Sequence, residues 1–323
     1  MTDATNATIG EKMPEAPARG RWADVWRQFR AHRGAFWGMM FLVFITLFVT
    51  VGPLIWPHDP TALDIRSKDM RPFYVGLFAG EDSNVKWSWE HPLGTDNLGR
   101  DLMAKLMLGG QVSLAVGWVA MLLALFLGAL IGVSAGFFKS LDGPLMRMTD
   151  LFLALPLLPL LLVMMLLFRE PLRATFGSET GTFILIVVVI GITSWMQTAR
   201  VVRGDVLALK EREFILAARS IGTPSSKIIS RHLLPNVMSA IMVSATLGLA
   251  NAIITESAIS FLGLGFPPDF PTWGKLLSDA TSRLQRFPER VIWPGVAISF
   301  TVLAVNYMGD GLRDALDPRI RGR

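Results

Sequence analysis

The sequence predicts an all-α polytopic membrane protein with six transmembrane helices. Of its 323 residues, 51% are hydrophobic and only 18% are charged, and the mean hydropathy is +0.44. This composition is too apolar for a soluble domain of that length. The apolar residues gather in segments that are long enough to cross a bilayer as helices. These segments are 36–56, 112–138, 148–168, 183–202, 237–264 and 291–308.

The composition also excludes several kinds of site. Without cysteine, the chain can form neither a disulfide scaffold nor a thiolate metal site. The cysteine content therefore does not indicate whether the protein resides in an oxidising or a reducing compartment. It has no phosphate-binding glycine-lysine loop, so any ATP chemistry must come from another chain. The pI of about 9.8 reflects basic residues dispersed between apolar segments, which favours a membrane topology over nucleic-acid binding.

The first 35 residues predict a tail and an interfacial helix. Residues 1–20 are small and polar, which is typical of a disordered tail. In 21–33, Trp22, Trp26 and Phe29 share one side of a helix that also carries arginines, which suits an anionic leaflet. The apolar run 36–56 starts too late and is too long for a cleaved signal peptide, so we expect the first span there, with Trp37 and Trp56 as interface anchors.

The next segment, 57–110, contains HPLGTDNLGRD at positions 91–101. Its proline and glycines predict turns, Thr95 or Asp96 is expected to cap a helix, and leucines at every fourth position predict a helix over 97–108 lying on the membrane. One alternative is a capped interfacial helix without any role in transport. A calcium site of Asp96, Asn97 and Asp101 is a weak alternative, because the spacing is not that of an EF-hand.

Glycine and proline set the expected packing of the second and third spans. Gly128, Gly132 and Gly136 are spaced by four and predict a smooth stripe against which another helix packs closely. Pro156 and Pro159 are expected to kink the third span.

The polar connection 203–236 predicts a pair of short helices over 211–236. Phe214, Ile215, Ala218 and Ile221 recur at spacings of three and four, so a helix over 211–221 has one apolar side. Gly222 is expected to end this helix, because glycine adopts the left-handed conformation of a C-cap without strain.

Thr223 and Pro224 predict the start of a second short helix, with the hydroxyl as cap and the proline at the first helical position. This helix is expected to run to about Leu234, where Pro235 interrupts it. The pair cannot bury its apolar side alone, and the small side chains of Ala217 and Ala218 are expected to let another surface approach. A pair that merely caps the bundle is the alternative.

Polar residues within the fifth and sixth spans are candidates for a translocation path or gate. They are Asn251, Glu256, Ser257 and Asn306. A carboxylate at membrane depth is costly unless it is paired, protonated or hydrated, so Glu256 is expected to face a cavity or a partner. A path or gate, a hydrogen bond at a subunit interface, and a position near the outer membrane boundary all remain open for it.

The connection 265–290 is expected to form a rigid outer cap. Pro267, Pro268 and Pro271 stiffen it. Trp273 is expected to anchor a re-entrant or interfacial helix, and such a cap suits contact with a substrate-delivering protein.

The distribution of basic residues predicts the orientation. Alternate connections hold 19 Lys and Arg in one set (1–35, 139–150, 199–236 and 309–323) and 12 in the other (57–112, 169–182 and 265–290). The positive-inside rule then places both termini and the loop 211–236 in the cytoplasm.

Several motifs resemble ABC importer permeases of the dipeptide and oligopeptide (nickel) family, second-permease type, over roughly residues 85–318. HPLGTDNLGRD matches a signature of that subunit at every fixed position, and ESAISFLGLG, PPDFPTWGKLL and HLLPN are similar as well. The loop 211–236 is similar to the "EAA" loop that docks on the cytoplasmic ATPase. It departs from that pattern at Leu216, where glutamate is usual, and at His232, where an aliphatic residue is usual.

The resemblance implies two groups of functional residues. The ATPase-coupling group is Phe214, Ala217, Ala218, Gly222, Thr223, His232, Leu234 and Pro235. The extracytoplasmic signature is His91, Pro92, Gly94, Thr95, Asp96, Gly99, Arg100 and Asp101.

The resemblance implies a non-catalytic subunit of the bacterial inner membrane that carries di- or oligopeptides. Nickel, glutathione or peptide antibiotics are alternative cargoes. The implied partners are a second homologous permease as a heterodimer, an extracytoplasmic substrate-binding protein, and two ATPases that bind ATP and Mg²⁺, while this chain binds no cofactor or metal. The implied units are a cytoplasmic tail with an interfacial helix (1–35), the first transmembrane helix (36–56), an extracytoplasmic segment (57–110) and a permease domain (111–318) with coupling loop 203–236.

Two competing functions have less support. A stand-alone secondary transporter is expected to show inverted repeats or several intramembrane charges, and Glu256 is essentially the one such charge. An intramembrane enzyme needs converging catalytic groups or metal ligands. However, the four histidines, at 32, 58, 91 and 232, are scattered and lie outside the spans.

Overall fold

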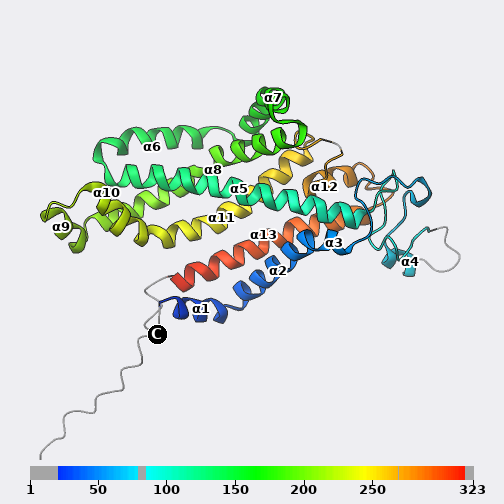
Figure 1. The fold of residues 1–323 in the computed structure, drawn as a ribbon, viewed down its shortest axis with the longest axis horizontal. Coiled ribbons are helices and arrows are strands. Elements are labelled where there is room, and N and C mark those ends of the chain that lie inside the picture. Colours follow the sequence, from blue (N-terminus) through cyan, green and yellow to red (C-terminus); the bar gives the residue numbers. More distant parts are fainter. Residues whose placement is uncertain (1–20, 79–84, 268, 317–323) are drawn as a thin grey trace, which may run out of the picture.

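The computed structural model describes residues 21–78, 85–267 and 269–316, and the secondary structure of this part is helical (Figure 1). The predicted tail, 1–20, lies outside the described residues. The α-helices are α1 (Arg21–Ala31), α2 (Arg33–Thr50), α3 (Gly52–Ile55), α4 (Phe73–Phe78), α5 (Leu102–Phe137), α6 (Lys139–Ala154), α7 (Leu157–Phe176), α8 (Ser178–Lys210), α9 (Glu213–Ser220), α10 (Ser225–Ile228), α11 (Leu234–Phe261), α12 (Trp273–Thr281) and α13 (Glu289–Leu316). A 3₁₀-helix, η1 (Ile65–Ser67), and a π-helix, η2 (Ile229–Leu233), complete them.

Five of the described helices or helix runs are long and apolar enough to cross a membrane, and a sixth span is possible if α6 and α7 are counted together. These two helices meet at 90°. The kink that the sequence predicts in the third span is therefore confirmed, but the predicted bounds of 148–168 differ from the helices, which are Lys139–Ala154 and Leu157–Phe176. The break lies at Leu155 and Pro156, because proline has no N–H to donate to an uninterrupted helix and restricts the residue before it.

The second span is longer than its apolar core suggests. Asp101 caps α5, since its Oδ2 accepts a hydrogen bond from the backbone N–H of Ala104 at 2.8 Å. The expected separate helix over 97–108 is thus wrong: its residues from Leu102 onward are the first turns of α5. The expected caps, Thr95 and Asp96, instead hold the preceding loop.

The glycine stripe of α5 packs against α8, as predicted. A Cβ on Gly128 would lie 2.6 Å from the Cβ of Thr198, one on Gly132 would lie 2.6 Å from the carbonyl oxygen of Ala199, and one on Gly136 would lie 2.7 Å from the Cβ of Val206. Side chains at these positions would push the two helices apart. In Figure 1, α5 and α8 run side by side through the middle of the bundle.

The N-terminal helix belongs partly to the protein core. Phe29 of α1 is buried together with Ala35 and Ala315, whereas Trp26 remains half exposed. The side chain of Trp22 lies outside the described residues. The predicted interfacial helix is therefore wrong in one respect: Phe29 does not face the membrane but packs on α13.

Candidate functional site

The loop between α8 and α11 forms the two short helices that the sequence predicts. Gly222 follows α9 with φ = +76°, a conformation that favours glycine. The backbone N–H of Thr223 donates to the carbonyl oxygen of Ala218 at 3.0 Å and closes the helix end. We call this segment, 211–236, the hairpin.

The second half of the hairpin differs from the prediction in two ways. Pro224 is itself the N-cap residue of α10, which begins at Ser225 without a side-chain cap, so capping by Thr223 is wrong. Pro235 does not interrupt the chain of helices either. It lies in the first turn of α11, directly after η2, where a missing N–H is tolerated. The side-chain amide of Asn236 donates to the carbonyl oxygen of His232 at 2.6 Å and supplies a donor there.

The hairpin has one buried face and one exposed face. Ile215 and Ala218 are buried in a cluster with the ends of α5 and α8. Phe214 and Ile221, which the sequence predicts on the same side, are instead 44% and 83% exposed. Ala217 is also exposed. It lies three residues after Phe214 and four before Ile221, so the three side chains share one side of the helix. The free face of α9 is therefore an apolar stripe with a small residue at its centre.

Three contacts hold the hairpin in place: one joins it to α5, one lies directly before it, and one connects its two halves. The guanidinium of Arg219 lies 5.1 Å from the ring centroid of Phe137 at the end of α5. Lys210 donates from Nζ to the carbonyl oxygen of Gly136 at 3.2 Å. The rings of Phe214 and His232 are 6.3 Å apart and connect α9 to η2. A force on α9 would therefore be transmitted to both α5 and α11.

A cavity of about 660 Å³ opens between the α6–α7 break, α8 and α11. Its polar lining residues are Thr193, Ser194, Gln197, Thr198, Ser244, Asn251 and Thr255. None of the described residues lining it is charged. Of the four path candidates, the structure places Asn251 here. Ser194 and Gln197 also line the cavity and were not among the predicted path residues, although polar residues at helical spacing in an apolar span are a usable signal.

The other path candidates lie elsewhere. Glu256 is fully buried, and its Oε1 accepts a hydrogen bond from the Ser260 hydroxyl at 2.7 Å. Hydroxyl groups of Ser113, Ser257 and Thr272 lie near the same carboxyl group, and its Oε2 is buried without a hydrogen-bond partner among the described residues. Glu256 thus faces polar groups of its own chain where α5, α11 and the residue before α12 meet. Asn306 is half-buried on α13 and does not line the cavity.

Helix α12 forms where the sequence predicts a helix in the cap, but Trp273 is not a membrane anchor. Trp273 is completely buried, and its Nε1 donates to the carbonyl oxygen of Leu106 at 3.0 Å. Its backbone N–H donates to the Ser113 hydroxyl at 3.2 Å. Trp273 therefore fixes α12 to α5.

The HPLGTDNLGRD segment ties the loop after α3 to the start of α5, at the end of the bundle opposite the hairpin (Figure 1). Asp101 accepts from Trp56 Nε1 at 2.9 Å, and its other oxygen lies 2.9 Å from His91 Nδ1. Trp56 therefore binds a protein group rather than serving simply as an interface anchor. Gly94 and Gly99 have φ near +80°, and a Cβ on Gly99 would overlap the carbonyl oxygen of Asp64 at 1.7 Å.

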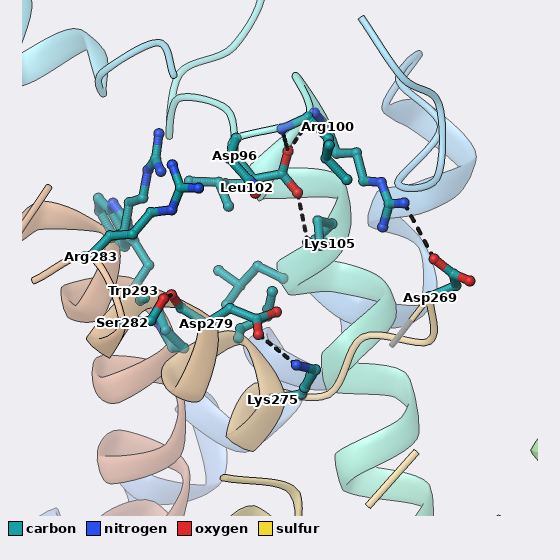
Figure 2. A pocket seen from close by; sticks show the side chains of 17 residues that line it. Asp96, Arg100, Leu102, Lys105, Asp269, Lys275, Asp279, Ser282, Arg283 and Trp293 are labelled. Carbon is teal, nitrogen blue, oxygen red and sulfur yellow. Dashed lines mark hydrogen bonds and ion pairs between the residues drawn. The ribbon is translucent and has the colours of Figure 1, made fainter. Parts of the chain in front are cut away.

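Next to this segment lies a charged cavity of about 340 Å³ (Figure 2). Asp96 accepts backbone hydrogen bonds from Leu98 and Arg100 and lies 3.0 Å from Lys105 Nζ. Burial raises the pKa of Asp96, but Lys105 and the two N–H donors outweigh it and hold this pKa below its ordinary value. Among the described residues, no group of three His, Cys, Asp or Glu could hold a metal, which removes support for the calcium alternative.

Two family models match the chain. Residues 103–322 match the model of the binding-protein-dependent transport system inner membrane component. Residues 20–72 match the model of the N-terminal transmembrane domain of oligopeptide transport permease C. Together they cover both sides of the loop that carries the HPLGTDNLGRD segment.

Individual relatives match over nearly the full length. A putative peptide permease protein of Brucella suis is 37% identical over 96% of this chain and 95% of its own. The oligopeptide transport system permease protein OppC of Bacillus subtilis is 33% identical over 98% and 96%, and the dipeptide transport system permease protein DppC of that organism is 34% identical over 92% and 86%. The fold is similar to a chain of the MetNI methionine ABC transporter in an inward-facing conformation, with a TM-score of 0.53 and 18% identity over 65% of this chain and 95% of that chain.

Proposed function

Because this chain belongs to the family of binding-protein-dependent inner-membrane transport components, as a non-catalytic permease subunit of a peptide ABC transport system, we propose that a cytoplasmic ATPase docks on its hairpin. The exposed apolar stripe of α9 carries this proposal, since such a stripe outside the membrane fits a protein partner. The termini lie on the same, cytoplasmic side. ATP and Mg²⁺ bind to the ATPases.

The uncharged polar cavity is this chain's share of the peptide path. Asn251, Gln197 and Ser194 offer donors and acceptors that suit a peptide backbone irrespective of its side chains. The cavity lies open at the side of one chain, which fits completion by a second, homologous permease. Its lining contains no histidine or carboxylate among the described residues, a composition that favours peptide over nickel as cargo.

The end of the bundle opposite the hairpin is the extracytoplasmic side, where a substrate-binding protein delivers the peptide. The buried contacts of Asp101, Thr95 and Trp273 make this end rigid. We propose the same order of units that the sequence suggests, a cytoplasmic tail, a first span, an outer segment and a permease domain, with the first helix of the permease domain, α5, beginning at Leu102. The hairpin moves with the ATPases, and the spans attached to it tilt to give alternating access.

Reconstitution tests the proposal. Proteoliposomes containing this chain, its partner permease, the ATPases and the binding protein are expected to accumulate a radiolabelled dipeptide only when ATP is supplied on the ATPase side. Vesicles that lack the ATPases are the control and are expected to show no uptake. Peptide uptake by this chain alone, without nucleotide, would show that it is a secondary transporter.

A further inference from the structure

Two arginines on α7 lack a counter-ion within the described part of the chain. Arg169 and Arg173 are four residues apart and so lie on the same side of the helix. No described carboxylate oxygen lies within 4.0 Å of either guanidinium. Arginine stays charged in proteins, so the two positive charges cannot be relieved by loss of a proton.

Both guanidinium groups have donors left over. Arg169 donates from Nη2 to the carbonyl oxygen of Gly265 at 3.3 Å, and Arg173 donates from Nε to the Thr182 hydroxyl at 3.1 Å. The Nε of Arg169 and one Nη of Arg173 are buried without a partner. Buried donors on charged groups are costly to leave unpaired, so the pair calls for an acceptor that carries negative charge.

The surroundings hold the two arginines together despite their repulsion. The positive charge of Arg173 disfavours the charge on Arg169, and the neighbouring Glu170 offsets part of this repulsion without forming an ion pair with it. The backbones of α7 and α8 touch beside them, since a Cβ on Gly181 would lie 2.4 Å from the carbonyl oxygen of Leu172. The pair is therefore fixed by the fold and arranged before any anion binds.

The neighbouring surface shows what kind of anion fits. Leu166 and Leu167, one turn or less before Arg169, are 66% and 62% exposed, and Phe168 is exposed as well. Helix α7 lies at the edge of the bundle (Figure 1). Neither arginine lines the polar cavity assigned to the peptide. A ligand with an anionic head and an apolar body matches this surface.

We propose that Arg169 and Arg173 bind the phosphate of a membrane phospholipid, whose acyl chains cover the exposed apolar residues of α7. Guanidinium groups bind phosphate through charge-assisted hydrogen bonds, and each arginine keeps one terminal Nη group that is not among the buried atoms and has no hydrogen-bond partner among the described residues. The lipid is then a structural component at the junction of α7, α8 and the segment before α12.

Native mass spectrometry of the assembled transporter tests this. After delipidation, phosphatidylglycerol or phosphatidylethanolamine is added back and bound phospholipid is counted. The Arg169→Gln/Arg173→Gln variant is expected to bind the tightest phospholipid at least about tenfold more weakly. Arg169→Lys/Arg173→Lys, which keeps the charge but loses the paired geometry, is expected to be intermediate. Arg147→Gln, an exposed arginine of α6, is the control and is expected to match the wild type.

Three results would overturn the proposal. Unchanged phospholipid binding in the double glutamine variant would show that the arginines hold no lipid. Loss of the partner permease with unchanged lipid counts would assign the pair to a subunit contact. A raised KM for peptide with unchanged lipid counts would assign it to the substrate. Both arginine variants are first checked for wild-type elution in size-exclusion chromatography.

Discussion

Ala217→Asp is expected to abolish ATP-driven peptide uptake and to release the ATPase, while the chain still inserts and folds. Ala217 is exposed on α9 at helical spacing from Phe214 and Ile221, so its replacement disturbs no internal packing. A carboxylate at the centre of an apolar interface loses its hydration without gaining a partner, which costs several kcal/mol, about a thousandfold in affinity. Co-purification of the ATPase with the tagged permease, together with uptake into vesicles, measures the effect.

Ser140→Asp is the matched control for Ala217→Asp. Ser140 is exposed near the start of α6, outside the hairpin but on the side predicted to be cytoplasmic. It introduces the same charge and is expected to leave both ATPase binding and uptake at wild-type levels. If the ATPase co-purifies with the Ala217→Asp permease at wild-type yield, the stripe on α9 is not the docking surface.

Gly132→Leu is expected to prevent assembly of the bundle. A Cβ at this position already meets the carbonyl oxygen of Ala199 at 2.6 Å and Val202 at 2.8 Å, so a leucine must separate α5 from α8. Overpacking of this kind destabilises by about 3 kcal/mol, and here a backbone atom is in the way, which leaves little room for relaxation. The expected result is loss of monodisperse protein and a markedly lower thermal midpoint in detergent.

Gly204→Leu provides the comparison for Gly132→Leu. Gly204 is also a helical glycine, on α8, but nothing lies within 4 Å of a Cβ built there. Leucine has a better helix propensity than glycine, so this variant is expected to be as stable as the wild type or slightly more so. Equal stability of the two leucine variants would contradict the close approach of α5 and α8.

Much of this architecture could be predicted from the sequence, because apolar segment length and glycine spacing act locally and strongly. The spans, the glycine stripe and the hairpin with its turn at Gly222 all follow from such patterns. The boundary of α5 could not be placed, because its cap residue, Asp101, is held in position by Trp56, which lies 45 residues earlier in the chain, and by His91.

The errors arose where tertiary contacts decide what a residue faces. Helical spacing places Phe214 near Ile215, yet it cannot tell which of the two meets α5 and α8. Glu256 was expected to face a cavity or a partner because a buried carboxylate is costly. The hydroxyl groups that surround it come from three different segments, so sequence order does not reveal them. Pro235 was expected to interrupt a helix, but it lies in the first turn of α11, directly after η2, where its missing N–H is tolerated.

Crosslinking from a single cysteine shows whether the ATPase docks on the hairpin. The chain has no natural cysteine, so Ile221→Cys and Leu98→Cys each place one label on an exposed side chain at opposite ends of the bundle. With a photoactivatable maleimide in the assembled transporter, position 221 is expected to crosslink to the ATPase and position 98 is not. An ATPase adduct from position 98, or none from position 221, would show that the ATPase does not dock on the hairpin.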